Sequence, residues 1–170
     1  TGWLTNTTAI AVIPDPVVMR LWDTGVRLYA LPYYATTQTI ERRPDVLARF
    51  RKLDATTPVT YYSRGTGPAW WDQLKGLPFQ CLGVDWRHDI TEVLKNYSDQ
   101  WCIQGNVDPE WLHLPLAELE SRLREYFGRV KALPASLRRG WICGLGHGVL
   151  QRTPEENVRR FVTLQREIFG

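Results

Sequence analysis

Hydrophobic and polar positions change period several times between residue 59 and the end of this 170-residue chain. Short runs rich in β-branched, aromatic and other apolar residues indicate strands. The predicted strands are 59–62, 80–84, 101–104 and 140–145. The segments between them have apolar residues at helical spacing. The predicted helices are 69–75, 90–96 and 116–133. Strands that alternate with helices predict an α/β fold with a parallel sheet and crossover helices.

The two ends of the chain differ in how clearly they predict structure. Near the C-terminus, Thr153, Pro154 and Glu156 have the spacing of a capping box, so we expect Thr153 to cap a last helix. In the first 58 residues we expect strands at 9–13 and 17–22, and a helix at 44–53.

The number of repeating units limits the architecture. Four strand-then-helix units and an earlier strand are recognisable, whereas a closed eight-unit barrel typically needs about 250 residues. We therefore predict one domain over residues 1–170, of the parallel (β/α) TIM-barrel type, that is incomplete or part of a longer chain.

Composition narrows the functional classes. The formal charge of +3, from 21 Lys and Arg against 18 Asp and Glu, is small for a nucleic-acid-binding protein, so we expect no nucleic-acid partner. No apolar run approaches the ~20 residues of a membrane span, and we expect no membrane association. Three cysteines without a CxxC pair favour neither a disulfide framework nor a zinc site. We therefore expect a cytoplasmic protein without a bound metal.

Candidate functional residues follow the predicted strands, where parallel α/β folds place their sites. The four segments combine glycine with polar side chains, and they are 62–67, 83–87, 104–109 and 144–148. His147, between two glycines, suits either a functional or a structural role. Asp85 suits a ligand contact or a turn held by backbone amides. Arg64 and Arg87 are either carboxylate-binding or ordinary surface arginines, because a guanidinium can bind a carboxylate with two hydrogen bonds. Asp108 before Pro109 predicts an N-cap.

Taken in order, these segments resemble the uroporphyrinogen decarboxylase family. Val84-Asp85-Trp86 is similar to its G-[LV]-D-W, 104–109 to its Q-G-N-x-D-P, and 144–148 to its N-L-G-H-G. Residues 30–33 are similar to its A-L-P-Y, so the resemblance covers roughly 20–170 and is strongest from residue 83. Arg64 stands where the family has lysine.

The resemblance implies the C-terminal half of a TIM-type barrel that acts in the cytoplasm, usually as a dimer. The family removes the carboxyl groups of the four acetates of uroporphyrinogen to give coproporphyrinogen, in tetrapyrrole and haem biosynthesis, without a cofactor. His147 matches the family's substrate-contacting histidine and is our candidate catalytic residue. Thr24, Arg64 and Asp85 are further substrate-binding candidates. The family's catalytic aspartate, its arginine segment and its tyrosine belong to the N-terminal half and have no match here.

Two other functions stay open. One is a non-catalytic barrel fragment that serves in binding or assembly. The other is a zinc-dependent corrinoid methyltransferase of the same superfamily, although its His-x-Cys strand end has no counterpart near residues 62–64.

Overall fold

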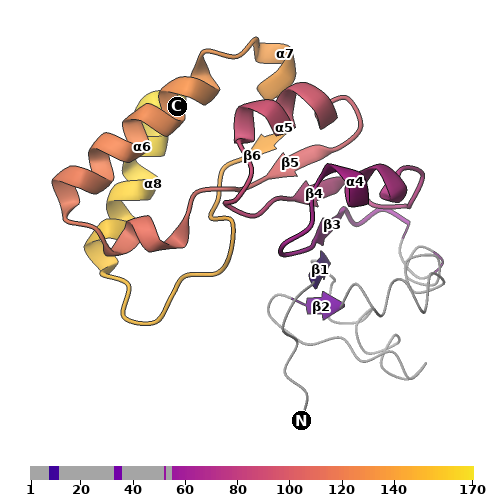
Figure 1. Ribbon diagram of the computed structural model, residues 1–170, viewed down its shortest axis with the longest axis horizontal. Helices are drawn as coiled ribbons and strands as arrows, with labels where there is room; N and C mark the ends of the chain where they lie inside the picture. The colour runs from indigo at the N-terminus through magenta and orange to yellow at the C-terminus, as the bar shows by residue number, and fades with distance from the viewer. Residues whose placement is uncertain (1–7, 12–32, 36–51, 53–54) are drawn as a thin grey trace. The chain divides into compact units, whose positions relative to one another are not determined.

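The computed structural model describes residues 8–11, 33–35, 52 and 55–170 (Figure 1). The chain forms two compact units, one over residues 1–83 and the other over residues 84–170. Three predictions lie outside the described residues: the strand at 17–22, the helix at 44–53 except for residue 52, and the site residue Thr24. The assignment of the whole chain to one domain stays a prediction.

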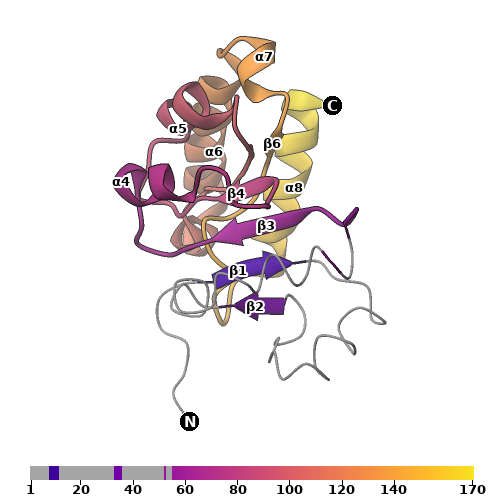
Figure 2. The ribbon, with the colours of Figure 1, turned by 90° about the vertical axis from the view of Figure 1, so that its right-hand side faces the viewer.

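Among the described residues of the first unit, four short segments form strands. They are β1 (Thr8–Ala11), β2 (Tyr33–Ala35), β3 (Val59–Tyr62) and β4 (Cys81–Gly83). β1 pairs antiparallel with both β2 and β3, and Figure 2 shows these three strands next to one another. β3 pairs parallel with β4, with Tyr62 opposite Gly83.

A helical crossover joins the two parallel strands of this unit. It consists of α4 (Pro68–Trp71) and the 3₁₀ helix η1 (Asp72–Leu74). Trp71 and Leu74 are buried, as are Val59 and Tyr61 of β3. A parallel pair needs such a crossover, because the chain must return to the edge where the first strand began.

The second unit alternates helices with two parallel strands. In chain order it contains α5 (Ile90–Tyr97), β5 (Cys102–Gln104), η2 (Pro109–His113), α6 (Leu116–Lys131), α7 (Ala135–Arg138), β6 (Trp141–Ile142) and α8 (Glu155–Phe169). β5 and β6 pair with Ile103 opposite Trp141, and a parallel bridge joins Val107 to Leu145 beyond them. The pairing therefore continues past the C-terminal ends of the two strands, into the segments predicted to carry the site.

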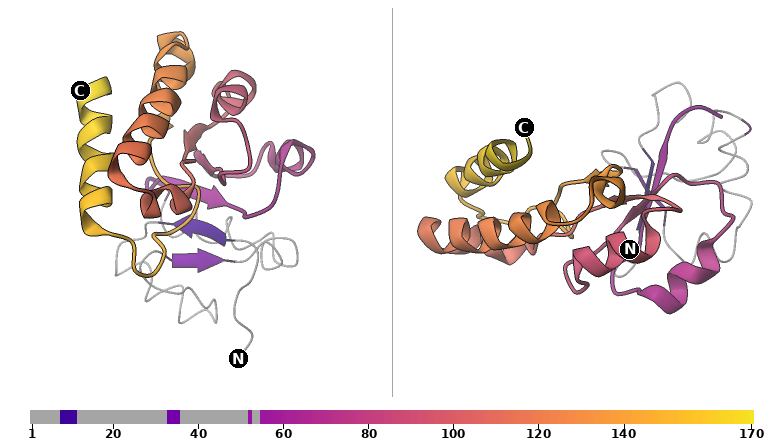
Figure 3. Two further views of the ribbon diagram at one scale, coloured as in Figure 1. Left: turned by 60° about the vertical axis from the view of Figure 1, so that its left-hand side comes forward. Right: turned by 90° about the horizontal axis from the view of Figure 1, so that it is seen from above.

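Helices α6 and α8 lie side by side and run in the same direction (Figures 1 and 3). Their inward faces bury Leu123, Phe127 and Leu164 completely. On the outside, Arg160 of α8 pairs with Glu120 of α6, and Lys131 donates a hydrogen bond to the carbonyl of Ile168 at 2.6 Å. The apolar stripe predicted for 116–133 is thus the face that α6 buries.

The structure confirms the α/β class and all four predicted strand-then-helix units. The predicted earlier strand at 9–13 exists in part as β1, but its pairing is antiparallel, so it is no further unit of the parallel sheet. The capping box was wrong, because the Thr153 hydroxyl donates to the carbonyl of Leu150 at 2.8 Å and caps no amide of α8. The N-cap at Asp108 is confirmed, since its carboxylate accepts from the Glu110 amide at 3.0 Å.

Candidate functional site

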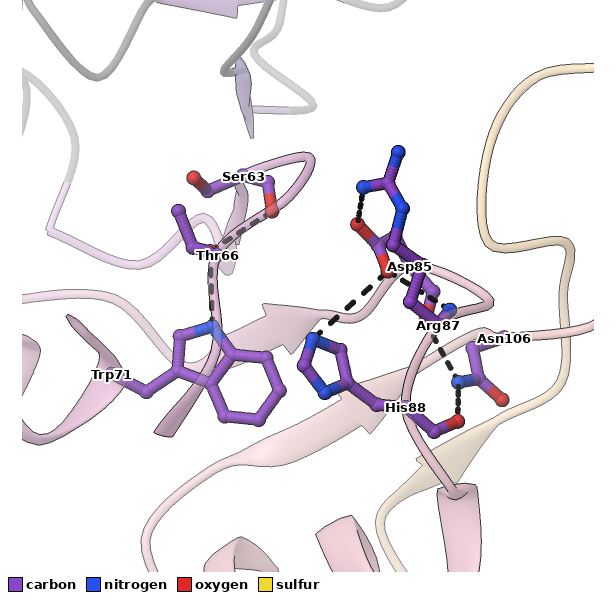
Figure 4. A network of polar contacts seen from close by, with 7 residues as sticks. All are labelled: Ser63, Thr66, Trp71, Asp85, Arg87, His88 and Asn106. Atoms are coloured by element: carbon purple, nitrogen blue, oxygen red, sulfur yellow. Dashed lines mark hydrogen bonds and ion pairs between the residues drawn. The ribbon is translucent and has the colours of Figure 1, made fainter. Parts of the chain in front are cut away.

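Asp85 forms the centre of the turn that connects β4 to α5. Its carboxylate is fully buried and accepts hydrogen bonds from the Arg87 amide at 3.0 Å and from the Arg87 guanidinium at 2.9 Å. Figure 4 shows the carboxylate between Arg87 and the imidazole of His88, whose Nε2 lies 4.0 Å away. A buried carboxylate needs such partners, because burial without them carries a large desolvation cost. Asp85 therefore both fixes the turn and holds Arg87.

The loop after β5 is held against this turn by Asn106. Its amide group donates to the carbonyls of Asp85 at 2.8 Å and His88 at 2.7 Å (Figure 4). Gly105 precedes it at φ +125°, and a Cβ there would lie 2.5 Å from the Val84 carbonyl oxygen. Glycine is the residue that tolerates both this conformation and this approach. The Gly-Asn pair thus joins the loop after β5 to the Asp85 turn within the second unit.

Tyr126 of α6 also holds the loop after β5 in place. Its hydroxyl accepts a hydrogen bond from the backbone N–H of Asn106 at 3.0 Å and donates one to the side-chain oxygen of Asn106 at 3.1 Å. Burial raises the pKa of Tyr126 well above its ordinary value, so the hydroxyl keeps its proton and can donate. Tyr126 was not among the predicted site residues, although it lies on the apolar face of a predicted helix, where a hydroxyl needs a partner.

The 144–148 segment closes onto the same turn. The Gly146 amide donates to the Val107 carbonyl at 2.8 Å, and the Val107 amide donates to the Gly144 carbonyl at 3.0 Å. A Cβ on Gly146 would lie 2.4 Å from the Trp86 nitrogen and 2.9 Å from the Asp85 carbonyl carbon. Gly146 therefore lets two backbones touch, and this contact brings His147 to Trp86.

The indole of Trp86 contacts two functional groups. The His147 ring meets its indole edge to face at 6.1 Å between centroids, and the Arg87 guanidinium lies over it at 5.0 Å. His147 is exposed, and the Arg87 side chain is 46% exposed. We call Asp85, Trp86, Arg87 and His147 the Trp86 cluster. It presents an imidazole and a guanidinium to solvent, and both groups can donate hydrogen bonds to anions.

The chain is similar to known proteins over most of its length. The family model described as "Uroporphyrinogen decarboxylase (URO-D)" matches residues 31–168. The chain belongs to the uroporphyrinogen decarboxylase family. A protein named uroporphyrinogen decarboxylase from Solibacter usitatus is 37% identical over 110 residues, which are 65% of this chain and 30% of the relative.

Two further relatives with the same name agree with this assignment. The protein from Trichodesmium erythraeum is 31% identical over 140 residues, 82% of this chain and 35% of the relative. That from Chloroflexus aggregans is 38% identical over 115 residues, 67% of this chain and 30% of the relative. The chain thus spans about a third of the length of these relatives. The parallel strand-and-helix units fit part of the barrel expected for the family.

The residues that the family resemblance singled out lie in different places. Asp85 and His147 come together in the Trp86 cluster, and Asn106 supports it. Arg64 is an exposed residue of the first unit, in a turn where the Thr66 hydroxyl donates to the Ser63 carbonyl at 3.0 Å (Figure 4). The substrate-binding roles assigned to Asp85, His147, Arg64 and Thr24 stay predictions.

Cys81, Cys102 and Cys143, which are all described, form no disulfide bond. Cys143 is partly buried, and this burial raises its pKa to about 12. Within residues 55–170 and the shorter described stretches, no three His, Cys, Asp or Glu side chains gather as a metal site would require. In the same residues no helix is long and apolar enough to cross a membrane.

Proposed function

We propose that the protein is a uroporphyrinogen decarboxylase, a carboxy-lyase that converts uroporphyrinogen to coproporphyrinogen, and that the Trp86 cluster contributes to its substrate-binding surface. Membership of the family supports the reaction. The observation that supports the site is the meeting of three strand-end segments around Trp86, with Gly146 pressed on the Asp85–Trp86 backbone. Parallel α/β proteins place their functional groups at such strand ends.

The reaction places clear demands on the protein. In each cycle the bond between an acetate methylene and its carboxylate breaks, carbon dioxide leaves, and the electron pair moves into a pyrrole ring that has been protonated. A proton then adds to the methylene carbon and gives a methyl group, and the ring loses the proton that it had gained, so that the pyrrole is restored. A carboxylate that stabilises the cationic ring would supply the main electrostatic contribution. The family places this carboxylate in the N-terminal half.

The role proposed for His147 is to bind a substrate carboxylate and so position one acetate. Its exposed imidazole, which packs edge to face with Trp86, supports this role because orientation lowers the entropic part of a barrier. The proposal includes a cofactor-independent reaction, because the protonated pyrrole itself serves as the electron sink. It also includes a cytoplasmic homodimer, as the family resemblance implies.

Chromatography of reaction products tests the proposed function. Protein expressed from the complete reading frame that encodes this sequence is incubated with uroporphyrinogen under reducing conditions, and the products are oxidised to porphyrins and separated by carboxylate number. We expect porphyrins with seven, six, five and finally four carboxylates. Recovery of the eight-carboxylate porphyrin alone, while a known decarboxylase converts the same substrate, would reject the enzyme. Tight binding without conversion would then favour the non-catalytic barrel fragment.

A further inference from the structure

We propose that Arg87 is a second carboxylate-binding residue of the site and, with His147, forms a two-point contact for a polycarboxylated tetrapyrrole. This inference rests on the proposed function and extends it to a residue outside the motifs that carry the family resemblance. The contact would select substrates by their number of carboxylates.

The side chain of Arg87 is held in place before any ligand binds. Its Nη1 donates to Asp85 at 2.9 Å, its amide donates to the same carboxylate at 3.0 Å, and its guanidinium lies over Trp86 at 5.0 Å. An arginine held by two side chains has lost much of its conformational freedom already, so ligand binding costs less entropy. Its planar donor set then lies ready for a carboxylate.

Arg87 keeps N–H donors for a ligand. A guanidinium has five N–H donors. Among the described residues it donates to Asp85, and with 46% of its side chain exposed its other donors can reach an anion in solvent. The Asp85 carboxylate is completely buried and binds Arg87 from the protein side. The exposed part of the ion pair is therefore cationic.

Arg87 and His147 share a neighbour, the indole of Trp86. Both groups contact the same indole, at 5.0 Å for the guanidinium and 6.1 Å for the imidazole. A single acetate or propionate meets one of them. A tetrapyrrole has carboxylates on every ring and can meet both, so the pair discriminates by carboxylate number.

A second arginine of the same unit provides a matched control. Arg122 of α6 also lies over an indole, that of Trp111 at 5.7 Å, and also pairs with a carboxylate, that of Glu118 at 2.8 Å. Its side chain is 47% exposed, close to the value for Arg87. Glu118, however, is itself exposed and lies on the same helix, and His147 is not among the ring partners of Trp111. Arg122→Ala therefore removes the same charge and stacking without touching the Trp86 cluster.

The experiment compares Arg87→Ala, Arg87→Lys and Arg122→Ala in protein from the complete reading frame. KM and kcat are measured with uroporphyrinogen, and Kd is measured separately by fluorescence titration with uroporphyrin, which has eight carboxylates. Arg87→Ala should raise KM and Kd about 10-fold, the size of one charge-assisted hydrogen bond, with kcat little changed. Arg87→Lys should recover part of the loss, because it keeps the charge without the planar fork. Arg122→Ala should match the wild type.

The outcomes separate this inference from the proposed function. Unchanged KM and Kd in Arg87→Ala would overturn the inference even if the wild type is a decarboxylase. An equal loss in Arg122→Ala would also overturn it, because net charge would then explain the effect. If the wild type converts no substrate, the proposed function fails. A 10-fold weaker uroporphyrin Kd confined to the Arg87 variants would still support Arg87 as a carboxylate-binding residue.

Discussion

Gly146→Ala is the substitution that tests the packing of the site most sharply. The added methyl group would lie 2.4 Å from the Trp86 nitrogen and 2.9 Å from the Asp85 carbonyl carbon. Both are backbone atoms, so no side chain can rotate away to make room. The backbone of Gly146 lies outside the left-handed region, so alanine itself is tolerated there and the clash is the whole perturbation.

The expected cost follows from the size of this overlap. Extra methyl groups in closely packed regions typically cost about 1–3 kcal/mol, which for a chain of this length corresponds to a Tm decrease of about 3–10 °C. Relief of the clash must move the 144–148 segment away from the Asp85 turn. That movement would weaken the hydrogen bond from the Gly146 amide to Val107 and separate His147 from Trp86. We therefore expect lower stability together with a loss of kcat/KM.

Gly148→Ala serves as the matched control, because a Cβ on Gly148 meets no atom within 4 Å. Both substitutions flank His147 and add the same methyl group. Thermal unfolding and uroporphyrinogen decarboxylation are measured for both variants and the wild type. Gly148→Ala should resemble the wild type in Tm and kcat/KM. If Gly146→Ala is equally harmless, the 144–148 segment does not pack on the Asp85 turn and the described site is wrong.

Three further predictions concern single side chains. His147→Asn should lower kcat/KM about 10- to 100-fold and leave partly decarboxylated porphyrins, and unchanged kinetics would make His147 structural. Burial raises the pKa of Cys143 to about 12, so this thiol should react with iodoacetamide at pH 8 far more slowly than the exposed thiol of Cys102. Mass spectrometry after labelling measures both rates, and equal rates would contradict this prediction. Burial raises the pKa of Asp89, but hydrogen bonds and Arg129 lower it more, to a net value below the ordinary one. The ionised carboxylate therefore stabilises the fold above about pH 4, and this contribution is lost as the pH falls through the folded pKa. Asp89→Asn should lower the free energy of unfolding at pH 7. Urea unfolding should also show a smaller loss of stability between neutral and acid pH for this variant than for the wild type.

The local structure of the second unit could be predicted well from its sequence. Helix α6 has a regular apolar stripe from Leu119 to Val130, and Asp108 caps η2 as its position before Pro109 predicted. The direction of β1 could not be predicted, because a short apolar run has the same pattern in parallel and antiparallel pairs. β2 was missed, because its three residues form too short a run to recognise as a strand. At Thr153 the hydroxyl bonds Leu150, a local alternative that the capping pattern does not exclude.

The Trp86 cluster shows where sequence reasoning stopped. Its segments could be chosen from the glycines and polar residues at strand ends, and the turn-fixing role considered for Asp85 is confirmed by its bond to the Arg87 amide. The stacking of Arg87 and His147 on one indole could not be predicted. About 60 residues separate the two side chains, and their meeting depends on how closely Gly146 approaches Trp86.

The release of carbon dioxide from uroporphyrinogen decides whether this protein is a decarboxylase. Protein from the complete reading frame is mixed with uroporphyrinogen in a sealed vessel, and the carbon dioxide formed per molecule of substrate consumed is measured to completion. We expect four molecules of carbon dioxide and one coproporphyrinogen per uroporphyrinogen consumed, with the same yield from chelator-treated and untreated protein. Substrate that is bound but releases no carbon dioxide would contradict the assignment of this protein as a decarboxylase.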